Sequence, residues 1–229
     1  LKPLLPEKAL GVDDWREQIS AWQKNYPVTL STNGNRLNPR EVIERLNTVF
    51  PDAIVTSEVG QNQMWAAQHF FYDKPLSFFS AGGLGGMGYS LPAAIGVQIA
   101  KPDDTVWSIS GDGGLQINIQ ELAMLAEYKL PVKIAVLNNG HLGMIRQFQN
   151  RYYGGRVMSA KLHNPDFAAV ARAFGIHGIS AGSNEDARKA IDEAMAHDGP
   201  VLIDFAVDPH EDVFPMVDPG ASLAETVEA

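Results

Sequence analysis

Two short stretches of this sequence decide its fold, and each closes an apolar run. Residues 108–114 read SISGDGG, which places an acidic residue between glycines, and residues 136–139 read VLNN, which ends in two asparagines. The apolar runs lack a polar and apolar alternation, as is typical of parallel strands that helices cover on both faces. Between the two stretches, residues 116–129 predict one helix, and Pro131 marks its end.

The polar residues of the two stretches can hold a metal ion and a diphosphate together. Ligands of open parallel sheets bind beyond the carboxyl ends of the strands, so Asp112 and Asn139 are expected to be neighbours. A carboxylate, an amide oxygen and a backbone carbonyl near His141 would suit Mg²⁺ or Ca²⁺, and phosphate oxygens would complete the shell. The glycines allow close approach of the backbone to phosphate, and the N-terminus of the following helix attracts anions.

A simpler interpretation of each stretch is an ordinary turn between a strand and a helix. Glycine, aspartate and asparagine are common turn residues, and either stretch alone fits that interpretation equally well. The pair favours a functional site, because the intervening residues 114–137 contain one helix and one strand, which brings both turns to the same edge of the sheet.

The rest of the chain repeats the alternation of strand and helix patterns. Asn38 and Pro39 are expected to cap and begin a helix, and Asn184 is expected to cap another. Further helices are expected at residues 13–24, 91–100, 166–174 and 184–196. Strands are expected at residues 53–56, 76–79, 105–109, 132–137 and 201–207. The sequence predicts an α/β fold, a doubly wound and mainly parallel sheet with helices on both faces.

Three regions differ in character along the chain. Residues 1–37 predict a helix, with Trp15, Ile19 and Trp22 on one face, followed by a polar linker, and they are expected to be the remnant of a preceding domain. Residues 38–208 form the predicted α/β domain. Residues 209–229 predict an irregular tail over the surface, because prolines interrupt them.

Composition limits the classes of partner. The 229 residues carry a formal net charge of −9, which opposes binding to nucleic acid or to an anionic membrane surface. No apolar run reaches the roughly 18–20 residues of a membrane span. The sequence has no cysteine, which excludes thiolate metal sites and disulfides and is compatible with a cytoplasmic location. The six histidines lack the spacing of a zinc site.

Several motifs around the two stretches resemble one family of enzymes. The GDG and NN stretches look like the signature of thiamine diphosphate (ThDP) enzymes. Five further segments are similar to the catalytic subunit of acetolactate synthase (acetohydroxyacid synthase), from about Trp15 to the C-terminus. These are GQNQMWAAQ at 60–68, GGLGGMGY at 82–89, LPAAIG at 91–96, NIQEL at 118–122 and FPMV at 214–217.

This resemblance implies a role for particular residues. Asp112, Asn139 and the carbonyl of His141 would bind Mg²⁺. Met87 would wedge between the two rings of ThDP and bend the cofactor, so that its amino group lies close to the reactive carbon. The other residues implied to contact the cofactor are Val59, Gly60, Gln61, Asn62, Gly85, Gly111, Gly113, Gly114, Leu115 and Met144.

The activity that the resemblance implies is that of a transferase that joins two 2-oxo acids. Such an enzyme decarboxylates pyruvate and ligates the hydroxyethyl unit to a second 2-oxo acid, in branched-chain amino acid biosynthesis. The full enzyme is expected to be at least a homodimer, with FAD as a possible further cofactor and a possible regulatory subunit. The alternatives are another ThDP-dependent decarboxylase or carboligase subunit, and a non-catalytic module that binds the cofactor.

Three departures from the family pattern affect these expectations. Asn62 stands where the family usually has histidine, which alters one diphosphate contact. Phe148 stands where the family often has the tryptophan that selects 2-oxobutyrate as second substrate. The glutamate that protonates the cofactor ring belongs to a separate domain outside these residues. We therefore expect that the chain alone binds Mg²⁺ and ThDP weakly and is inactive.

Overall fold

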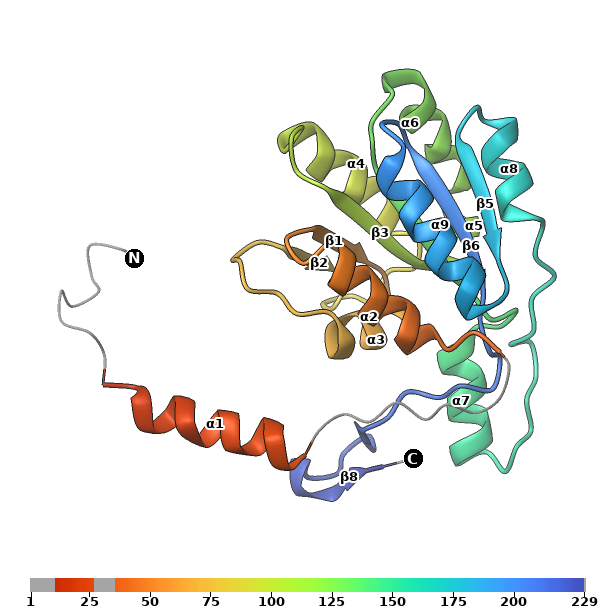
Figure 1. Ribbon diagram of the computed structural model, residues 1–229. Helices are drawn as coiled ribbons and strands as arrows, with labels where there is room; N and C mark the ends of the chain where they lie inside the picture. Colours follow the sequence, from red (N-terminus) through yellow and green to blue (C-terminus); the bar gives the residue numbers. More distant parts are fainter. Residues whose placement is uncertain (1–10, 27–35, 229) are drawn as a thin grey trace. The chain divides into compact units, whose positions relative to one another are not determined.

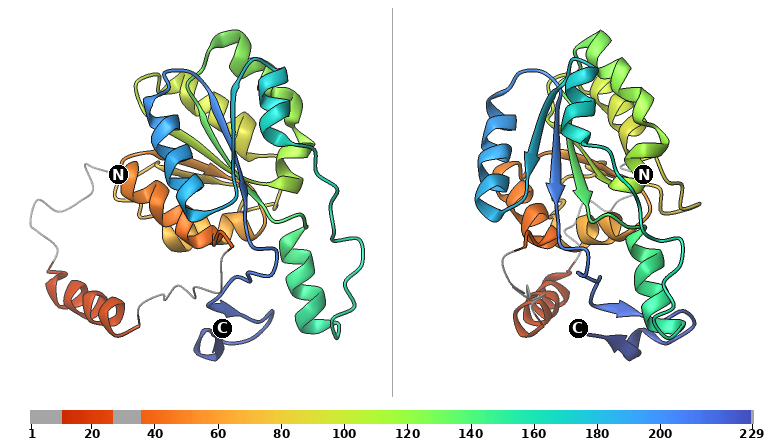
Figure 2. Two further views of the ribbon diagram at one scale, coloured as in Figure 1. Left: turned by 45° about the vertical axis from the view of Figure 1, so that its right-hand side comes forward. Right: turned by 90° about the vertical axis from the view of Figure 1, so that its right-hand side faces the viewer.

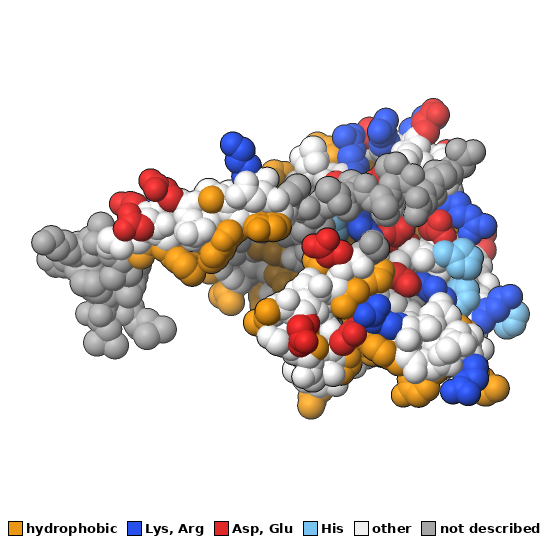
Figure 3. Space-filling view, turned by 90° about the horizontal axis from the view of Figure 1, so that it is seen from below, with side chains coloured by type: hydrophobic (Ala, Val, Ile, Leu, Met, Phe, Trp, Pro, Cys, Tyr) orange, Lys and Arg blue, Asp and Glu red, His pale blue; other side chains and the backbone are white. Residues whose placement is uncertain are grey.

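The computed structural model describes residues 11–26 and 36–228, and the chain divides into two compact units, Leu1–Ser31 and Thr32–Ala229. The described part of the first unit is helix α1 (Asp13–Asn25). Trp15 and Trp22 pack edge to face on it, with ring centroids 5.6 Å apart. Hydrophobic side chains gather along one side of this helix (Figure 3), which agrees with the predicted stripe, and all of its residues are exposed.

The second unit is built on a six-stranded sheet in which every pair of neighbouring strands is parallel. The strands follow the order β2-β1-β3-β4-β6-β5 (Figure 1). This observation confirms the predicted parallel α/β fold. The strands are β1 (Ile54–Ser57), β2 (Phe78–Ser80), β3 (Val106–Gly111), β4 (Lys133–Asn138), β5 (His177–Ala181) and β6 (Val201–Ala206).

Helices cover both faces of the sheet, as the two views in Figure 2 show. One face carries α2 (Pro39–Val49), α3 (Gln61–His69) and α9 (Asn184–Ala196). The other carries α4 (Ser90–Ala100), α5 (Asp112–Ile117), α6 (Leu122–Tyr128) and α8 (Phe167–Ala173). Helix α7 (Gly143–Tyr152) lies beyond the sheet, past the carboxyl end of β4 (Figure 1).

Two hydrophobic cores follow from this arrangement, one on each face. Successive residues of a strand point to opposite faces, so Ala135 and Leu137 of β4 join one core and Ile134 and Val136 the other. The interior residues of β3 and β4 are buried throughout. This burial explains why β4 shows no polar and apolar alternation in the sequence, and it leaves the polar Ser108 and Ser110 of β3 buried.

The predicted helix at residues 116–129 is wrong in its start and in its continuity. Helix α5 begins at Asp112, and the chain breaks at Asn118 before a short 3-10 turn (Ile119–Glu121) and α6. Asn118 leaves the helical conformation (φ −124°), and its side-chain amide donates to the carbonyl of Gly88 (2.7 Å). A tertiary hydrogen bond therefore interrupts the helical pattern, which local propensity does not reveal.

Other details also differ from the sequence-based expectations. Asn38 caps α2 as predicted, because its side chain accepts from the N–H of Arg40 (2.8 Å). Helix α9 is capped by Ser183, and Asn184 is its first residue. The sequence patterns did not predict three further elements, which are α3, α7 and β5.

The tail after residue 208 is more ordered than the sequence indicates. It forms a small hairpin of β7 (Met216–Val217) and β8 (Thr226–Val227), with a 3-10 turn (Leu223–Glu225) between them. Val213 and Met216 are buried in the second unit. The tail is thus anchored by side chains that pack into the domain. In the described residues, no helix is long and apolar enough to cross a membrane.

Two glycines give a matched test of the packing between β5 and α8. A Cβ at Gly178 would lie 2.2 Å from the backbone oxygen of Ala168, whereas a Cβ at the exposed, helical Gly96 would meet nothing within 4 Å. Gly178→Ala is therefore expected to lower the free energy of unfolding by roughly 1–3 kcal/mol. Gly96→Ala is expected to raise it by about 0.5–1 kcal/mol.

Denaturant unfolding of both variants measures these two changes in stability. Equal stability of Gly178→Ala and the unaltered protein would contradict the described contact between strand and helix.

Candidate functional site

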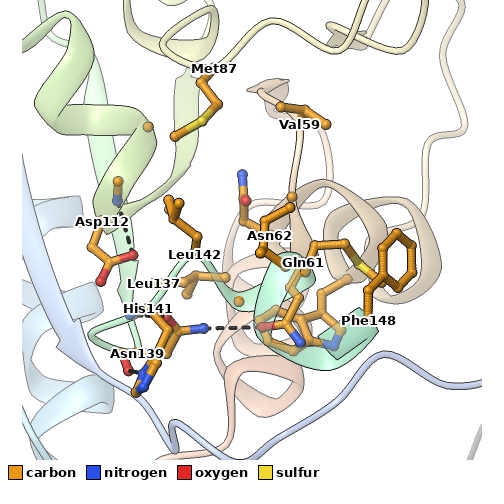
Figure 4. A pocket seen from close by; sticks show the side chains of 18 residues that line it. Val59, Gln61, Asn62, Met87, Asp112, Leu137, Asn139, His141, Leu142 and Phe148 are labelled. Carbon is orange, nitrogen blue, oxygen red and sulfur yellow. Dashed lines mark hydrogen bonds between the residues drawn. The ribbon is translucent and has the colours of Figure 1, made fainter. Parts of the chain in front are cut away.

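The candidate site lies where β3 and β4 end. These strands are paired in parallel, with Gly111 opposite Leu137, so the turns that follow them emerge side by side. A pocket of about 290 Å³ opens at this edge of the sheet (Figure 4). In that view, Asp112 and Phe148 lie on opposite sides of the pocket, and Met87 reaches in between them from above.

The pocket collects most of the residues that the sequence predicts for the site. Thirteen of them line it, namely Val59, Gly60, Gln61, Asn62, Met87, Gly111, Asp112, Gly113, Gly114, Asn139, His141, Met144 and Phe148. Gly85 and Leu115 do not. Gly85 takes a left-handed conformation (φ +70°) beside Val59, and the Leu115 side chain is buried in the hydrophobic core. Five further lining residues were not predicted, Trp65, Leu137, Leu142, Gly143 and Ile145.

Asp112 is a buried carboxylate at the start of α5. One oxygen accepts from the side chain of Asn164 (2.7 Å), and the other accepts from the N–H of Gly113 (3.0 Å). Burial raises the pKa of Asp112, and the hydrogen bonds from Asn164, Gly113 and Gly140 oppose that rise. No lysine or arginine forms an ion pair with Asp112 within the described residues. A buried carboxylate with this environment is suited to bind a cation.

Asn139 is held in place at the end of β4 from two sides. Its side-chain N–H₂ donates to Gln61 Oε1 (3.1 Å), and its Oδ1 accepts from the N–H of His141 (3.0 Å). The imidazole Nδ1 of His141 lies 2.9 Å from the Asn139 carbonyl. An amide oxygen keeps a second lone pair after accepting one hydrogen bond, so Asn139 Oδ1 can still bind a metal.

These donors fit a hard cation that also binds phosphate. In residues 11–26 and 36–228, no three His, Asp or Glu side chains gather closely enough to hold a metal ion by themselves. Asp112 and Asn139 supply one carboxylate and one amide oxygen. Mg²⁺ is characteristically held by one or two carboxylates, with substrate phosphates and water as the remaining ligands. The donor set therefore fits Mg²⁺ together with a diphosphate.

The glycines after Asp112 keep the floor of the pocket free of side chains. A Cβ at Gly113 would lie 2.8 Å from Leu142 and 3.4 Å from the methyl group of Met87. A Cβ at Gly114 would lie 2.0 Å from a carboxylate oxygen of Glu58. Because α5 begins at Asp112, the N–H groups of its first turn belong to these glycines. The helix N-terminus that can approach an anion thus starts four residues earlier than predicted, at the glycines that were expected to contact the diphosphate.

Phe148 of α7 lies on one side of the pocket (Figure 4), and Met144 of the same helix also lines the pocket. Both residues also line a second cavity of about 520 Å³, whose other wall includes Pro215, Met216 and Val217 of the tail. Asn62 lies near the strand ends, and its amide N–H₂ is directed at Ser57 Oγ and at the carbonyls of Glu58 and Ile109 (each 3.3 Å).

A buried polar network ties the pocket to the tail. Gln61 Nε2 donates to Gln147 Oε1 (2.9 Å), and Gln147 exchanges two hydrogen bonds with the backbone of Val213 (2.9 and 3.1 Å). Arg146 donates to the carboxylate of Asp212 and to the carbonyl of Glu211 (3.2 Å). Helix α7 is therefore fixed between the pocket and the tail.

Two residues at the site escaped the sequence-based reasoning. Asn164 supports Asp112 and Asn138 at once, with its amide 2.8 Å from Asn138 Oδ1. Glu58 lies directly after β1, is 1% exposed, and accepts hydrogen bonds from the N–H groups of Gly88 (2.7 Å) and Gly111 (3.1 Å). Burial raises the pKa of Glu58 to about 7, against hydrogen bonds from Gly88, Gly111 and Ser110 that lower it. The one local signal for Glu58 is its position at a strand end.

Comparison with known proteins agrees with this geometry. Residues 58–205, more than half of the chain, match the family described as thiamine pyrophosphate enzyme, C-terminal TPP binding domain; thiamine pyrophosphate is another name for ThDP. The chain belongs to this family. The matched span contains every predicted site residue, and it ends within the last strand of the sheet.

Individual relatives point to one group of ThDP enzymes. The chain is 40% identical to the acetolactate synthase large subunit of Porphyra purpurea, over 97% of this chain and 37% of that protein. It is 40% identical to the acetolactate synthase isozyme 2 large subunit of Escherichia coli, over 100% of this chain and 42% of that protein. It is 43% identical to an acetolactate synthase of Mycobacterium bovis, over 93% of this chain and 36% of that protein. The chain thus spans about two fifths of the length of these relatives.

The link between pocket and tail can be tested at Gln147. Gln147→Ala leaves the buried N–H and carbonyl of Val213 without their partner, whereas Gln61 Nε2 keeps its hydrogen bond to the Glu211 carbonyl (3.2 Å). The change is expected to cost roughly 2–4 kcal/mol of stability. Hydrogen exchange at the Val213 amide should become faster in Gln147→Ala, by a larger factor than the loss in global stability alone would produce. The exposed Asn150 of the same helix provides the control Asn150→Ala. Unchanged exchange at Val213 in Gln147→Ala would contradict the network.

Proposed function

We propose that the chain is the cofactor-binding part of an acetolactate synthase catalytic subunit. The whole enzyme would decarboxylate pyruvate and ligate the two-carbon unit to a second 2-oxo acid. The observation that supports this most strongly is one pocket that unites Asp112 and Asn139 with Met87 and Phe148. The identity of about 40% to acetolactate synthase large subunits over nearly the whole chain favours this chemistry over that of other ThDP enzymes.

In this proposal, one end of the pocket anchors the diphosphate. Asp112, Asn139 Oδ1 and the carbonyl of His141 would hold Mg²⁺, which would supply positive charge for phosphate oxygens in a protein whose net charge is −9. The N–H of Gly114 would face the same anion, while the N–H of Gly113 donates to Asp112. Asn164 keeps the Asp112 carboxylate oriented, because it donates to one of its two oxygens.

The other end of the pocket holds the reactive part of the cofactor and the substrates. ThDP supplies an electron sink that makes the decarboxylation of a 2-oxo acid possible. Met87 supports the cofactor in a bent shape from above, and its side chain reaches toward the Gly113 turn. Met144 and Phe148 form an apolar wall that keeps water away from the reacting atoms.

A complete active site would also require a glutamate that does not belong to the 229 residues of this chain. The glutamate that the family resemblance assigns to a separate domain would protonate the cofactor ring. In acetolactate synthases that domain comes from a partner subunit, so the complete site would form in a homodimer. The full-length protein is therefore the appropriate material for tests of activity.

Asp112 offers a direct test of the metal anchor. In the full-length protein, Asp112→Asn is expected to weaken Mg²⁺-dependent ThDP binding by roughly 10–100-fold, because a neutral amide replaces the only carboxylate proposed as a ligand. Calorimetric titration of ThDP at several Mg²⁺ concentrations measures this loss. Asp103→Asn, at an exposed position before β3, is the control and should leave binding unchanged. Equal cofactor affinity of Asp112→Asn and the unaltered protein would show that the anchor is misplaced.

The reaction itself is tested by product analysis. Full-length protein supplied with Mg²⁺, ThDP and pyruvate should release one CO₂ for every two pyruvate molecules consumed and form acetolactate. Release of acetaldehyde in place of acetolactate would identify a decarboxylase and contradict the proposal. Tight ThDP binding without turnover of pyruvate would support a non-catalytic module instead.

A further inference from the structure

Glu58 is a buried carboxylate to which the family resemblance gives no role. It follows β1 directly, and the pocket-lining residues do not include it. Each of its two oxygens accepts one backbone N–H from a different loop. Oε2 accepts from Gly88, in the glycine-rich loop, and Oε1 accepts from Gly111, in the turn after β3.

The two loops that Glu58 joins carry the two functional ends of the pocket. Gly88 directly follows Met87, and Gly111 directly precedes Asp112. The two loops are not neighbours along the chain. Beyond Gly88, Ser90 Oγ lies 2.7 Å from Ser110 Oγ, which precedes Gly111, and Glu58 is the carboxylate that binds the backbone of both loops. The Glu58 carboxylate therefore helps to fix Met87, the residue proposed to bend the cofactor, relative to Asp112, the residue proposed to bind the metal.

The surroundings are shaped around this carboxylate. Gly114 has no side chain at the point where a Cβ would lie 2.0 Å from Glu58 Oε1 and 2.2 Å from Cδ. Gly88 takes a left-handed conformation (φ +79°), and a Cβ there would lie 2.9 Å from the amide of Asn118. That amide donates to the carbonyl of Gly88, which holds the loop from its other side. The space for the Glu58 carboxylate therefore exists because residue 114, which follows Asp112 by two positions, is a glycine.

We propose that Glu58 is a positioning residue that holds Met87 and Asp112 at the separation that ThDP requires. The identity of the ligand rests on the proposed function, whereas the bridge between the loops rests on the geometry of this chain. Glu58 does not act as an acid or base on the cofactor, because it is 1% exposed and both of its oxygens accept hydrogen bonds from the protein. Glu58 therefore differs from the glutamate expected from a separate domain, which would protonate the cofactor ring.

Two substitutions of Glu58 test whether it acts as a hydrogen-bond acceptor for both loops or only fills space. Glu58→Gln keeps the volume but turns an N–H₂ group toward one of the two backbone N–H groups, so one end of the bridge is lost. Glu58→Asp keeps both acceptors on a side chain that is one methylene shorter and cannot reach both loops. Each variant is expected to bind ThDP at least tenfold more weakly at saturating Mg²⁺ in the full-length protein. A second readout is the ¹³C-methyl resonance of Met87 without cofactor, which should shift or broaden in both variants.

Gln98→Ala is the matched control. Gln98 is also buried, and its amide donates to the carbonyls of Lys101 and Asp104 (each 3.0 Å), close to the opposite end of β3. Its loss should lower stability without a change in ThDP affinity or in the Met87 resonance. If Gln98→Ala weakened ThDP binding as much as Glu58→Gln at an equal loss of stability, Glu58 would have a general structural role and the proposal would be wrong.

Hydrogen exchange in the unaltered protein provides a test that needs no variant. The amides of Gly88 and Gly111 should both exchange slowly without cofactor, since Glu58 already occupies them. Fast exchange at either amide would overturn the bridge, even if the Glu58 variants did not fold. If the protein bound no ThDP but both amides were protected and Met87 responded to Glu58→Gln, the proposed function would fail while the bridge between the loops would stand.

Discussion

The parallel pairing of β3 with β4 is the constraint on which the site depends. Its register places Gly111 opposite Leu137, so the chain leaves both strands at the same edge of the sheet. Asp112 and Asn139 then follow within two residues of the paired positions, although Leu137 lies 26 positions after Gly111 in the sequence. A slip of this register would move the two oxygen donors apart. The buried apolar residues of both strands oppose such a slip, because it would break their packing against the helices on both faces.

Burial of Asp112 at this edge of the sheet disfavours its ionised form, and a bound cation would favour that form. Asp112 lies in surroundings that raise its pKa, and its described partners are neutral N–H donors. A raised pKa means that the folded protein holds the proton more tightly than the unfolded chain does, so ionisation of Asp112 opposes folding as the pH rises. A bound Mg²⁺ would reverse that sign, because it favours the carboxylate. In the proposed function, cofactor binding and local stability would be linked at this side chain, which Asn164 holds by a hydrogen bond.

The sequence predicted five of the six strands of the sheet, and it singled out residues that the structure brings together in one pocket, because those features are local. Apolar runs identify β3 and β4, and glycine, aspartate and asparagine identify the turns that follow them. Glu58 could not be predicted in this way, because its partners lie 30 and 53 positions further along the chain and are backbone groups without a sequence signature. The break at Asn118 has the same origin, a hydrogen bond to the distant Gly88. Helix α3 begins after Gly60 without a side-chain cap, which removes the usual signal for a helix start.

The position of the metal is the central claim, and a crystal structure of the full-length protein with Mg²⁺ and ThDP tests it most directly. One metal ion is expected about 2.0–2.1 Å from an oxygen of Asp112, from Asn139 Oδ1 and from the carbonyl oxygen of His141, with diphosphate oxygens in the same octahedral shell. The diphosphate should rest on Gly113 and Gly114, and the rings should lie under Met87. A diphosphate bound at another edge of the sheet, or a metal ion without contact to Asp112, would contradict the account.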